Sequence, residues 1–211
     1  MQTKPMKAFY KVKRAQSVIE PVIGRDSLLG LIFQLFEGLR DMFQRETQRK
    51  GYNMMKMVEQ KMLAFFDGDD RNPYFEAVYI SFYHYYHQQQ EASLDTSPQT
   101  MQHQSKQIVY YLEKCLTIQL LAYGKYHSSV LQTLHGLGDA YFRLDNKERC
   151  RECLLDTIDI SEKINAKQED VVQIQVALKL AQTEDPNQIK KIFEDLDKVE
   201  AHTIAAIKGS D

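Results

Sequence analysis

The chain has 211 residues, of which 43% are hydrophobic and 27% charged, and its formal net charge at neutral pH is −2. This composition is ordinary for a soluble globular protein, and the small negative charge argues against affinity of the whole chain for nucleic acid. No apolar run approaches the roughly 20 residues that span a bilayer, and the first residues lack the apolar core of a secretory signal.

Helix-breaking residues and cysteines are both scarce. Only 5 Pro and 9 Gly are present, which favours long helices over many short strands. The 3 cysteines are an odd, low number that fits a reducing compartment, so we expect a cytoplasmic protein.

Residues 1–25 form a basic segment. Its first 19 residues carry five Lys or Arg and no acid. Such charge suits an organelle-targeting segment or an acidic partner, but chain termini are usually loosely ordered. We expect a solvated, loosely ordered tail.

Residues 26–70 show the apolar spacing of a helical pair. Asp26 or Ser27 is the expected N-cap of the first helix, and Gly51 follows its end. The residues expected to point inward are Leu28, Leu31, Ile32, Leu35, Phe36, Leu39, Met42 and Phe43 in the first helix, and Met54, Met57, Val58, Met62 and Phe65 in the second. A Met-rich face adapts to partners or membrane surfaces, but we expect these side chains to form core.

Two candidate metal sites follow. Asp67, Asp69 and Asp70 lack the spacing of a calcium-binding EF-hand loop, so we expect a turn with a helix cap. His84 and His87 lie three residues apart on an aromatic-rich helix that begins at Pro73, and no further ligand is placed beside them. The aromatic residues would suit base stacking only with a basic groove, which residues 72–105 lack. We expect structural roles for all of them, and no metal or cofactor.

Residues 88–107 are rich in Gln and poor in apolar residues, which predicts an inserted flexible loop. The aromatic helix before it and a helix that begins near Lys106 would form a degenerate helix pair. Residues 71–211 are then one helical array.

The most informative stretch is Val109–Lys163, which predicts a helix, a short loop and two further helices. Val130, Leu134, Leu137 and Tyr141 form one apolar stripe. Gly138 and the small residues Cys150, Thr157 and Ser161 suit close helix packing. Cys150 and Cys153 form a Cys-x-x-Cys pair inside a helix, where packing is a better explanation than zinc or redox chemistry.

This stretch resembles a tetratricopeptide repeat, especially the long-repeat variety of kinesin light chains. The resemblance covers roughly residues 106–164. The positions in register are Gly124, His127, Val130, Thr133, Leu134, Leu137, Tyr141, Thr157, Ile158, Ile160, Glu162 and Lys163. The departures are Ser128, Leu131, Gly138, Asp145 and Cys150.

The resemblance implies an all-α solenoid of stacked antiparallel helix pairs whose first helices line a concave groove. The groove residues it implies are Gln132, His135, Asp139, Phe142 and Arg143. Chaperone-binding repeats carry Lys and Asn where this chain has His135 and Asp139, and an Asp would repel a peptide carboxylate. These residues are equally compatible with an ordinary solvent-exposed face.

After Lys163 the pattern predicts a worn terminal repeat, and a C-terminal capping helix that begins at Pro186 and is too short for a coiled coil. The leading hypothesis is a noncatalytic adaptor or scaffold that captures a protein, peptide or helix. The alternative is a structural subunit whose repeat surface is permanently buried in a larger multiprotein assembly. No nucleophile or base motif supports an enzyme.

Overall fold

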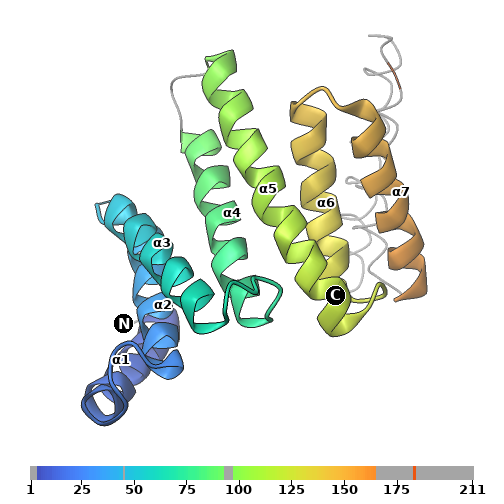
Figure 1. Cartoon of the computed structure of the whole chain (residues 1–211). Helices are drawn as coiled ribbons and strands as arrows, with labels where there is room; N and C mark the ends of the chain where they lie inside the picture. The colour runs from blue at the N-terminus through green and yellow to red at the C-terminus, as the bar shows by residue number, and fades with distance from the viewer. Residues whose placement is uncertain (1–3, 45, 93–96, 165–182, 184–211) are drawn as a thin grey trace, which may run out of the picture. The chain divides into compact units, whose positions relative to one another are not determined.

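The computed structural model describes residues 4–44, 46–92, 97–164 and 183, with side chains described from residue 11 onwards. Every regular element within these ranges is an α-helix, which confirms the all-α prediction (Figure 1). The chain divides into two compact units, Met1–Ser93 and Leu94–Asp211. The helices are α1 Lys4–Ile23, α2 Leu28–Met42, α3 Gln48–Phe65 and α4 Tyr74–Ala92 in the first unit, and α5 Pro98–Tyr123, α6 Ser128–Arg143 and α7 Lys147–Lys163 in the second.

Helices α2 and α3 of the first unit pack closely through two glycines. A Cβ atom on Gly51 would lie only 2.3 Å from the backbone N of Met42 and 2.6 Å from the carbonyl O of Gly38. Both glycines are buried. Glycine at these positions lets the two backbones approach each other directly.

The row of residues that follows Gly51 at helical spacing also explains why the predicted inward face of α3 is partly wrong. Met55, Val58 and Met62 follow Gly51 at helical spacing and are fully buried, at 0% exposure. Met57 and Phe65, predicted to point inward, are exposed. The same error affects Phe36 of α2 and Phe43, which directly follows α2, because both are exposed. Leu31, Leu35 and Met42 are buried as predicted. A pair that meets at glycines buries a narrower stripe than the apolar spacing suggests.

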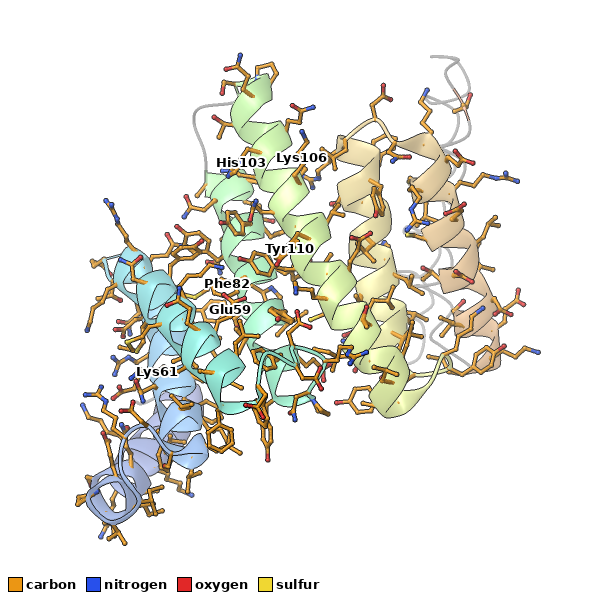
Figure 2. All side chains as sticks on the ribbon, viewed as in Figure 1. Glu59, Lys61, Phe82, His103, Lys106 and Tyr110 are labelled. Atoms are coloured by element: carbon orange, nitrogen blue, oxygen red, sulfur yellow. The ribbon has the colours of Figure 1, made fainter. Side chains whose placement is uncertain are left out.

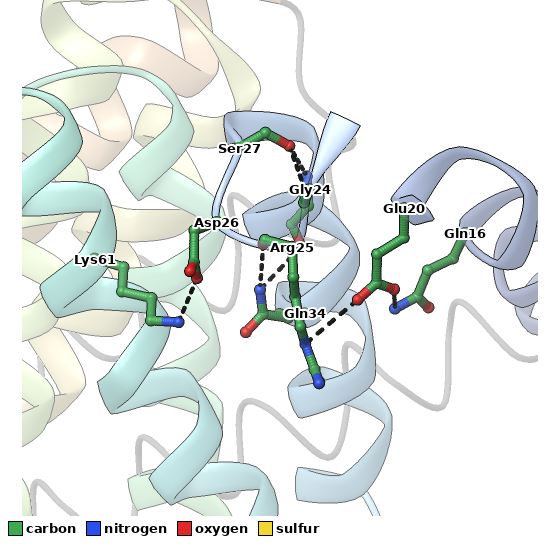
Figure 3. A network of polar contacts seen from close by, with 9 residues as sticks. Gln16, Glu20, Gly24, Arg25, Asp26, Ser27, Gln34 and Lys61 are labelled. Carbon is green, nitrogen blue, oxygen red and sulfur yellow. Dashed lines mark hydrogen bonds and ion pairs between the residues drawn. The ribbon is translucent and has the colours of Figure 1, made fainter. Parts of the chain in front are cut away.

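The basic N-terminal segment is helical rather than a loosely ordered tail, because α1 covers residues 4–23. A polar network fixes the turn that follows it (Figure 3). Glu20 accepts a hydrogen bond from Gln16 at 2.8 Å and pairs with Arg25 at 3.5 Å. The Gln34 amide donates to the carbonyl of Arg25 at 2.8 Å. A helix with such a tethered C-terminal turn is a structured part of the unit.

The aspartate-rich turn before α4 is held by side-chain caps, as predicted. Asp69 Oδ1 accepts from the backbone N–H of Arg71 at 3.2 Å, and Asn72 Oδ1 accepts from that of Tyr74 at 3.1 Å. Asp67 and Gly68 both adopt positive φ, at +52° and +84°. These caps satisfy the free amides at the start of the helix.

The aromatic residues of α4 serve as core. Phe75, Tyr79 and Phe82 are buried. Tyr52 of α3 packs against Phe82 at a centroid distance of 5.5 Å and shares a 3.0 Å hydrogen bond with the hydroxyl of Tyr86. Figure 2 labels Phe82 and Glu59 where α4 faces α3. The predicted structural role thus holds for these buried aromatic residues, whereas Tyr74 is exposed.

Helix takes most of the segment 88–107, for which the sequence predicts a flexible loop. Helix α4 continues to Ala92, and α5 begins at Pro98 rather than near Lys106. Ser97 caps α5, since its Oγ accepts from the backbone N–H of Thr100 at 3.3 Å. The prediction fails because Gln is a good helix former and because Pro98 occupies the first helical turn, where proline is favoured.

In the second unit, α6 packs against both α5 and α7, as the repeat pattern predicts (Figure 1). A Cβ atom on Gly138 would lie 2.9 Å from Leu154 Cδ2, which confirms that this glycine sits where the two helices of one repeat touch. The predicted inward residues of α6 and α7, among them Val130, Leu137 and Cys150, are buried except for Ile158, which is half-buried. The predicted terminal repeat and the capping helix from Pro186 lie outside the described residues.

Candidate functional site

Helix α6 carries the candidate site, and its start is fixed by two residues of the repeat signature. Gly124 ends α5 with φ of +78°, a conformation that side chains disfavour. His127 caps α6, because its Nδ1 accepts from the backbone N–H of Ser129 at 3.2 Å. The His127 ring also stacks on Tyr123 at a centroid distance of 4.5 Å. These contacts fix the point at which α6 begins.

The structure brings the five predicted groove residues to one side of α6. Gln132, Asp139, Phe142 and Arg143 are exposed, and His135 is half-buried. The helical turn of about 100° per residue puts all five within one broad strip. Phe142 is 49% exposed and carries the largest apolar side chain of the strip. We call these five residues the α6 strip.

The Asp139 carboxylate of the α6 strip lies beside a cation. Arg143 Nε donates to Asp139 Oδ2 at 3.0 Å, one helical turn away. Two exposed charges of opposite sign therefore lie side by side. The strip is nearly neutral, with an exposed aromatic ring beside an ion pair.

A pocket of about 420 Å³ lies on the other side of α6 and was not predicted from the sequence. Its apolar floor consists of Leu116 of α5, Leu134 and Leu137 of α6, and Cys153 of α7. Leu134, Leu137 and Cys153 are buried. Because Leu134 and Leu137 lie roughly opposite Gln132 and Asp139 on the helix, the pocket and the α6 strip are separate surfaces.

Charged side chains from α5 and α7 surround this apolar floor. They are Glu113, Arg149, Glu152 and Asp156, each about half exposed. Arg149 pairs with Glu152 at 2.7 Å and approaches Glu113 at 3.9 Å. We call the four residues the rim of the pocket.

Tyr141 connects the rim to the buried side of α6. Its hydroxyl donates to Glu113 Oε1 at 2.5 Å, and the Arg149 guanidinium lies 5.5 Å from the centre of its ring. Burial, together with the hydrogen bond to Glu113, raises the pKa of Tyr141 to about 12. The phenol therefore stays protonated near neutral pH and remains a hydrogen-bond donor that orients Glu113.

Lys125 ties the loop between α5 and α6 to α7. Lys125 Nζ lies 3.0 Å from both Asp156 and Asp159. These contacts raise the pKa of Lys125 above its usual value. The ammonium therefore stays charged and holds the loop against the rim.

The Cys-x-x-Cys pair has the surroundings of packing residues. Cys150 and Cys153 are buried and free. Burial raises the pKa of both thiols, to about 11 for Cys153. Since the thiolate is the nucleophile and the metal ligand, such thiols are poorly reactive. In the part of the chain that the structure describes, no three His, Cys, Asp or Glu side chains are grouped as metal ligands.

No protein-family model and no curated protein matches the sequence. Solved structures do match, and two of them are of a Podosopora anserina protein described as a kinesin light chain with nearly identical TPR-like repeats. The first, a single-substitution variant, has a TM-score of 0.64 at 16% identity and covers 95% of this chain and 88% of that one. The second has a TM-score of 0.61 at 16% identity and covers 94% and 88%.

The chain is thus a helical-repeat protein with the TPR-like solenoid fold, which agrees with the tetratricopeptide resemblance of its sequence. The similarity to the kinesin light chain structures, at this low identity, concerns the fold. Among the described helices, none is long and apolar enough to cross a membrane. The fold is one that generally presents surfaces for protein partners.

Proposed function

We propose that this protein is a noncatalytic adaptor or scaffold that captures a peptide or helix on the α6 strip. The observation that carries the proposal is the gathering of Gln132, His135, Asp139, Phe142 and Arg143 on one open side of a repeat helix. Repeat helices build extended surfaces for partners. An exposed ring beside polar groups is a common composition for the centre of such a surface.

The chemistry of the α6 strip defines the partner. A nearly neutral strip with one exposed aromatic ring favours a protein segment with an apolar side chain and hydrogen-bonding groups. Neither a nucleic acid nor a membrane is proposed as its ligand, because the paired Asp139 and Arg143 leave no excess positive charge there. The proposal places the protein in the cytoplasm, a reducing compartment that suits its three buried free cysteines.

Replacing Gln132, His135 and Asp139 together by Ala tests the proposal. Because Gln132 and Asp139 are exposed and Ala is a good helix former, the helical content should not change. Partners recovered by the unmodified protein in a pull-down should be lost or weakened. A matched control carries Glu148→Ala and Arg151→Ala on the exposed side of α7. Undiminished binding of every partner to the triple variant refutes the proposal.

A structural-subunit role is the second candidate, and one observation favours it. Large apolar side chains are exposed in both units, among them Phe36 and Phe65 in the first and Leu121 in the second. Residues of this kind are covered in permanent assemblies. The adaptor predicts a monodisperse monomer in light scattering, whereas the subunit predicts association or aggregation in the absence of its neighbours.

A further inference from the structure

The pocket between α5, α6 and α7 has a chemistry that the proposed function does not use. Its floor is apolar and, apart from the half-buried Leu116, buried, whereas its rim is charged and half exposed. A volume of about 420 Å³ accommodates a long side chain and its neighbours rather than a single water. The arrangement suits a ligand with an apolar stem and a polar end.

The rim carries an excess of negative charge. Three of its four members are carboxylates, and Arg149 is the single cation among the lining residues. Arg149 is shared between Glu152 and Glu113. Lys125 is shared in the same way between Asp156 and Asp159. Each of these cations thus serves two carboxylates, so the pocket attracts a further positive charge.

The apolar floor indicates which kind of cation fits the pocket. Lys and Arg side chains bury their methylene stems on apolar surface while the charged head stays near water. A guanidinium also meets carboxylates in a planar, bidentate geometry and is only weakly hydrated. A carboxylate ligand would be repelled by the rim, and a purely apolar one would leave the excess charge uncompensated.

We infer that this pocket binds a basic side chain, preferentially arginine, of a partner protein. The aliphatic stem lies against Leu116 and Leu137, and the guanidinium pairs with Glu152 and Asp156. The inference does not depend on the α6 strip, because the two surfaces lie on opposite sides of the helix. A partner that wraps around α6, or two separate partners, can use both.

The probes are short acetylated and amidated peptides of the form Ala-Leu-X-Ala, with X either arginine or citrulline. Citrulline has nearly the same shape as arginine but no charge. The readout is the NMR shift of the leucine methyl groups of the full chain, with Leu116, Leu134 and Leu137 as reporters. We expect saturable shifts at these methyls with roughly millimolar affinity for the arginine peptide. Binding of the citrulline peptide should be about fivefold weaker, which is the upper end of what an exposed ion pair contributes.

Three variants test which carboxylates cause the preference for the arginine peptide. Glu152→Gln and Asp156→Asn keep the shape of the rim and should each reduce the preference for arginine. Glu148→Gln, on the same helix but outside the pocket, should leave it unchanged. The triple alanine variant of the α6 strip should also bind the arginine peptide normally, so the two proposals fail independently.

Two results overturn the inference. The first is equal affinity for the arginine and citrulline peptides, or no saturable shift with either. The second is an arginine preference that survives in both rim variants, because the peptide would then bind elsewhere. Circular dichroism of each variant confirms that the helices remain intact, so that a lost preference reports the rim itself.

Discussion

Gly51→Ala should be strongly destabilising, although alanine is the better helix former. The added methyl carbon would lie 2.3 Å from the backbone N of Met42, 2.6 Å from the carbonyl O of Gly38 and 2.7 Å from the carbonyl C of Asp41. All three neighbours are backbone atoms, so no side chain can rotate away. Since non-bonded atoms prefer about 3.5–4.0 Å, α2 and α3 would have to separate by roughly 1 Å.

The magnitude follows from two opposing effects. Overpacking of this kind costs about 1–3 kcal/mol, and the rigid surroundings favour the upper end. The gain in helix propensity returns up to about 1 kcal/mol. A net loss of about 2 kcal/mol lowers the melting temperature of a unit of this size by roughly 10 °C.

Gly138→Ala is the matched control. Its added methyl would meet Leu154 Cδ2 at 2.9 Å and Cγ at 3.1 Å, which are atoms of a side chain that can move. The propensity gain is similar, so the net change should stay within about 1 kcal/mol. Because the two glycines belong to different units, thermal melting should be followed together with hydrogen exchange of α2–α3 and α6–α7 amides. A Gly51→Ala protein as stable as the unmodified one would show that the close approach of α2 and α3 is wrong.

Three further predictions address other parts of the chain. Burial raises the pKa of Asp41, but the cations of Arg40 and Lys50 outweigh burial and hold this pKa below its usual value. The ionised Asp41 carboxylate therefore stabilises the fold above about pH 4, and this contribution is lost as the pH falls further. Asp41→Asn should therefore lower the free energy of unfolding at neutral pH and much less in acid; an equal loss at both, in denaturant titrations, would contradict this. The Cys153 thiol is buried and its pKa is about 11, so it should resist alkylation by iodoacetamide until denaturant is added. Rapid alkylation of Cys153 in the folded protein, detected by mass spectrometry, would refute this prediction. Gly138→Leu should cost about 1–3 kcal/mol, because the larger side chain cannot share the space of Leu154, and an unchanged melting temperature would count against the helix contact.

The helix contacts around α6 were predictable because their information is local. Gly124 and His127 act within the turn between α5 and α6, and Gly138 acts between two consecutive helices. The α6 strip follows from helical periodicity once the buried stripe is known. Whether the strip binds a partner depends on chemistry outside the chain, so it stays a prediction.

The register of α3 was harder to predict, because Gly51 looks like a helix stop in the sequence but is a packing position in the structure. A Gly inside a helical pattern signals either role, and only the facing Gly38 and Met42 decide between them. The exposed Phe36 and Phe65 illustrate the consequence, since apolar spacing marks a wider stripe than the helix contact covers.

The pocket was missed because its parts are far apart in the sequence. Glu113 reaches Tyr141 and Arg149 only after α5, α6 and α7 have packed. One local signal was available, since Arg149, Glu152 and Asp156 recur at intervals of three and four on one side of α7. Such spacing alone is typical of an ordinary solvated face, and the apolar floor that distinguishes a pocket comes from other helices.

The contrast between the two sides of α6 has a consequence for how partners would be held. On the strip, Asp139 and Arg143 neutralise each other, so binding there would rest on Phe142 and on hydrogen bonds. In the pocket, excess carboxylate charge at an exposed rim makes the attraction electrostatic and therefore sensitive to screening by salt. Ionic strength would thus act on one surface and largely spare the other. A partner that uses both would be steered to α6 by the rim and retained by the strip, because charge chiefly accelerates association whereas packed contacts chiefly slow dissociation.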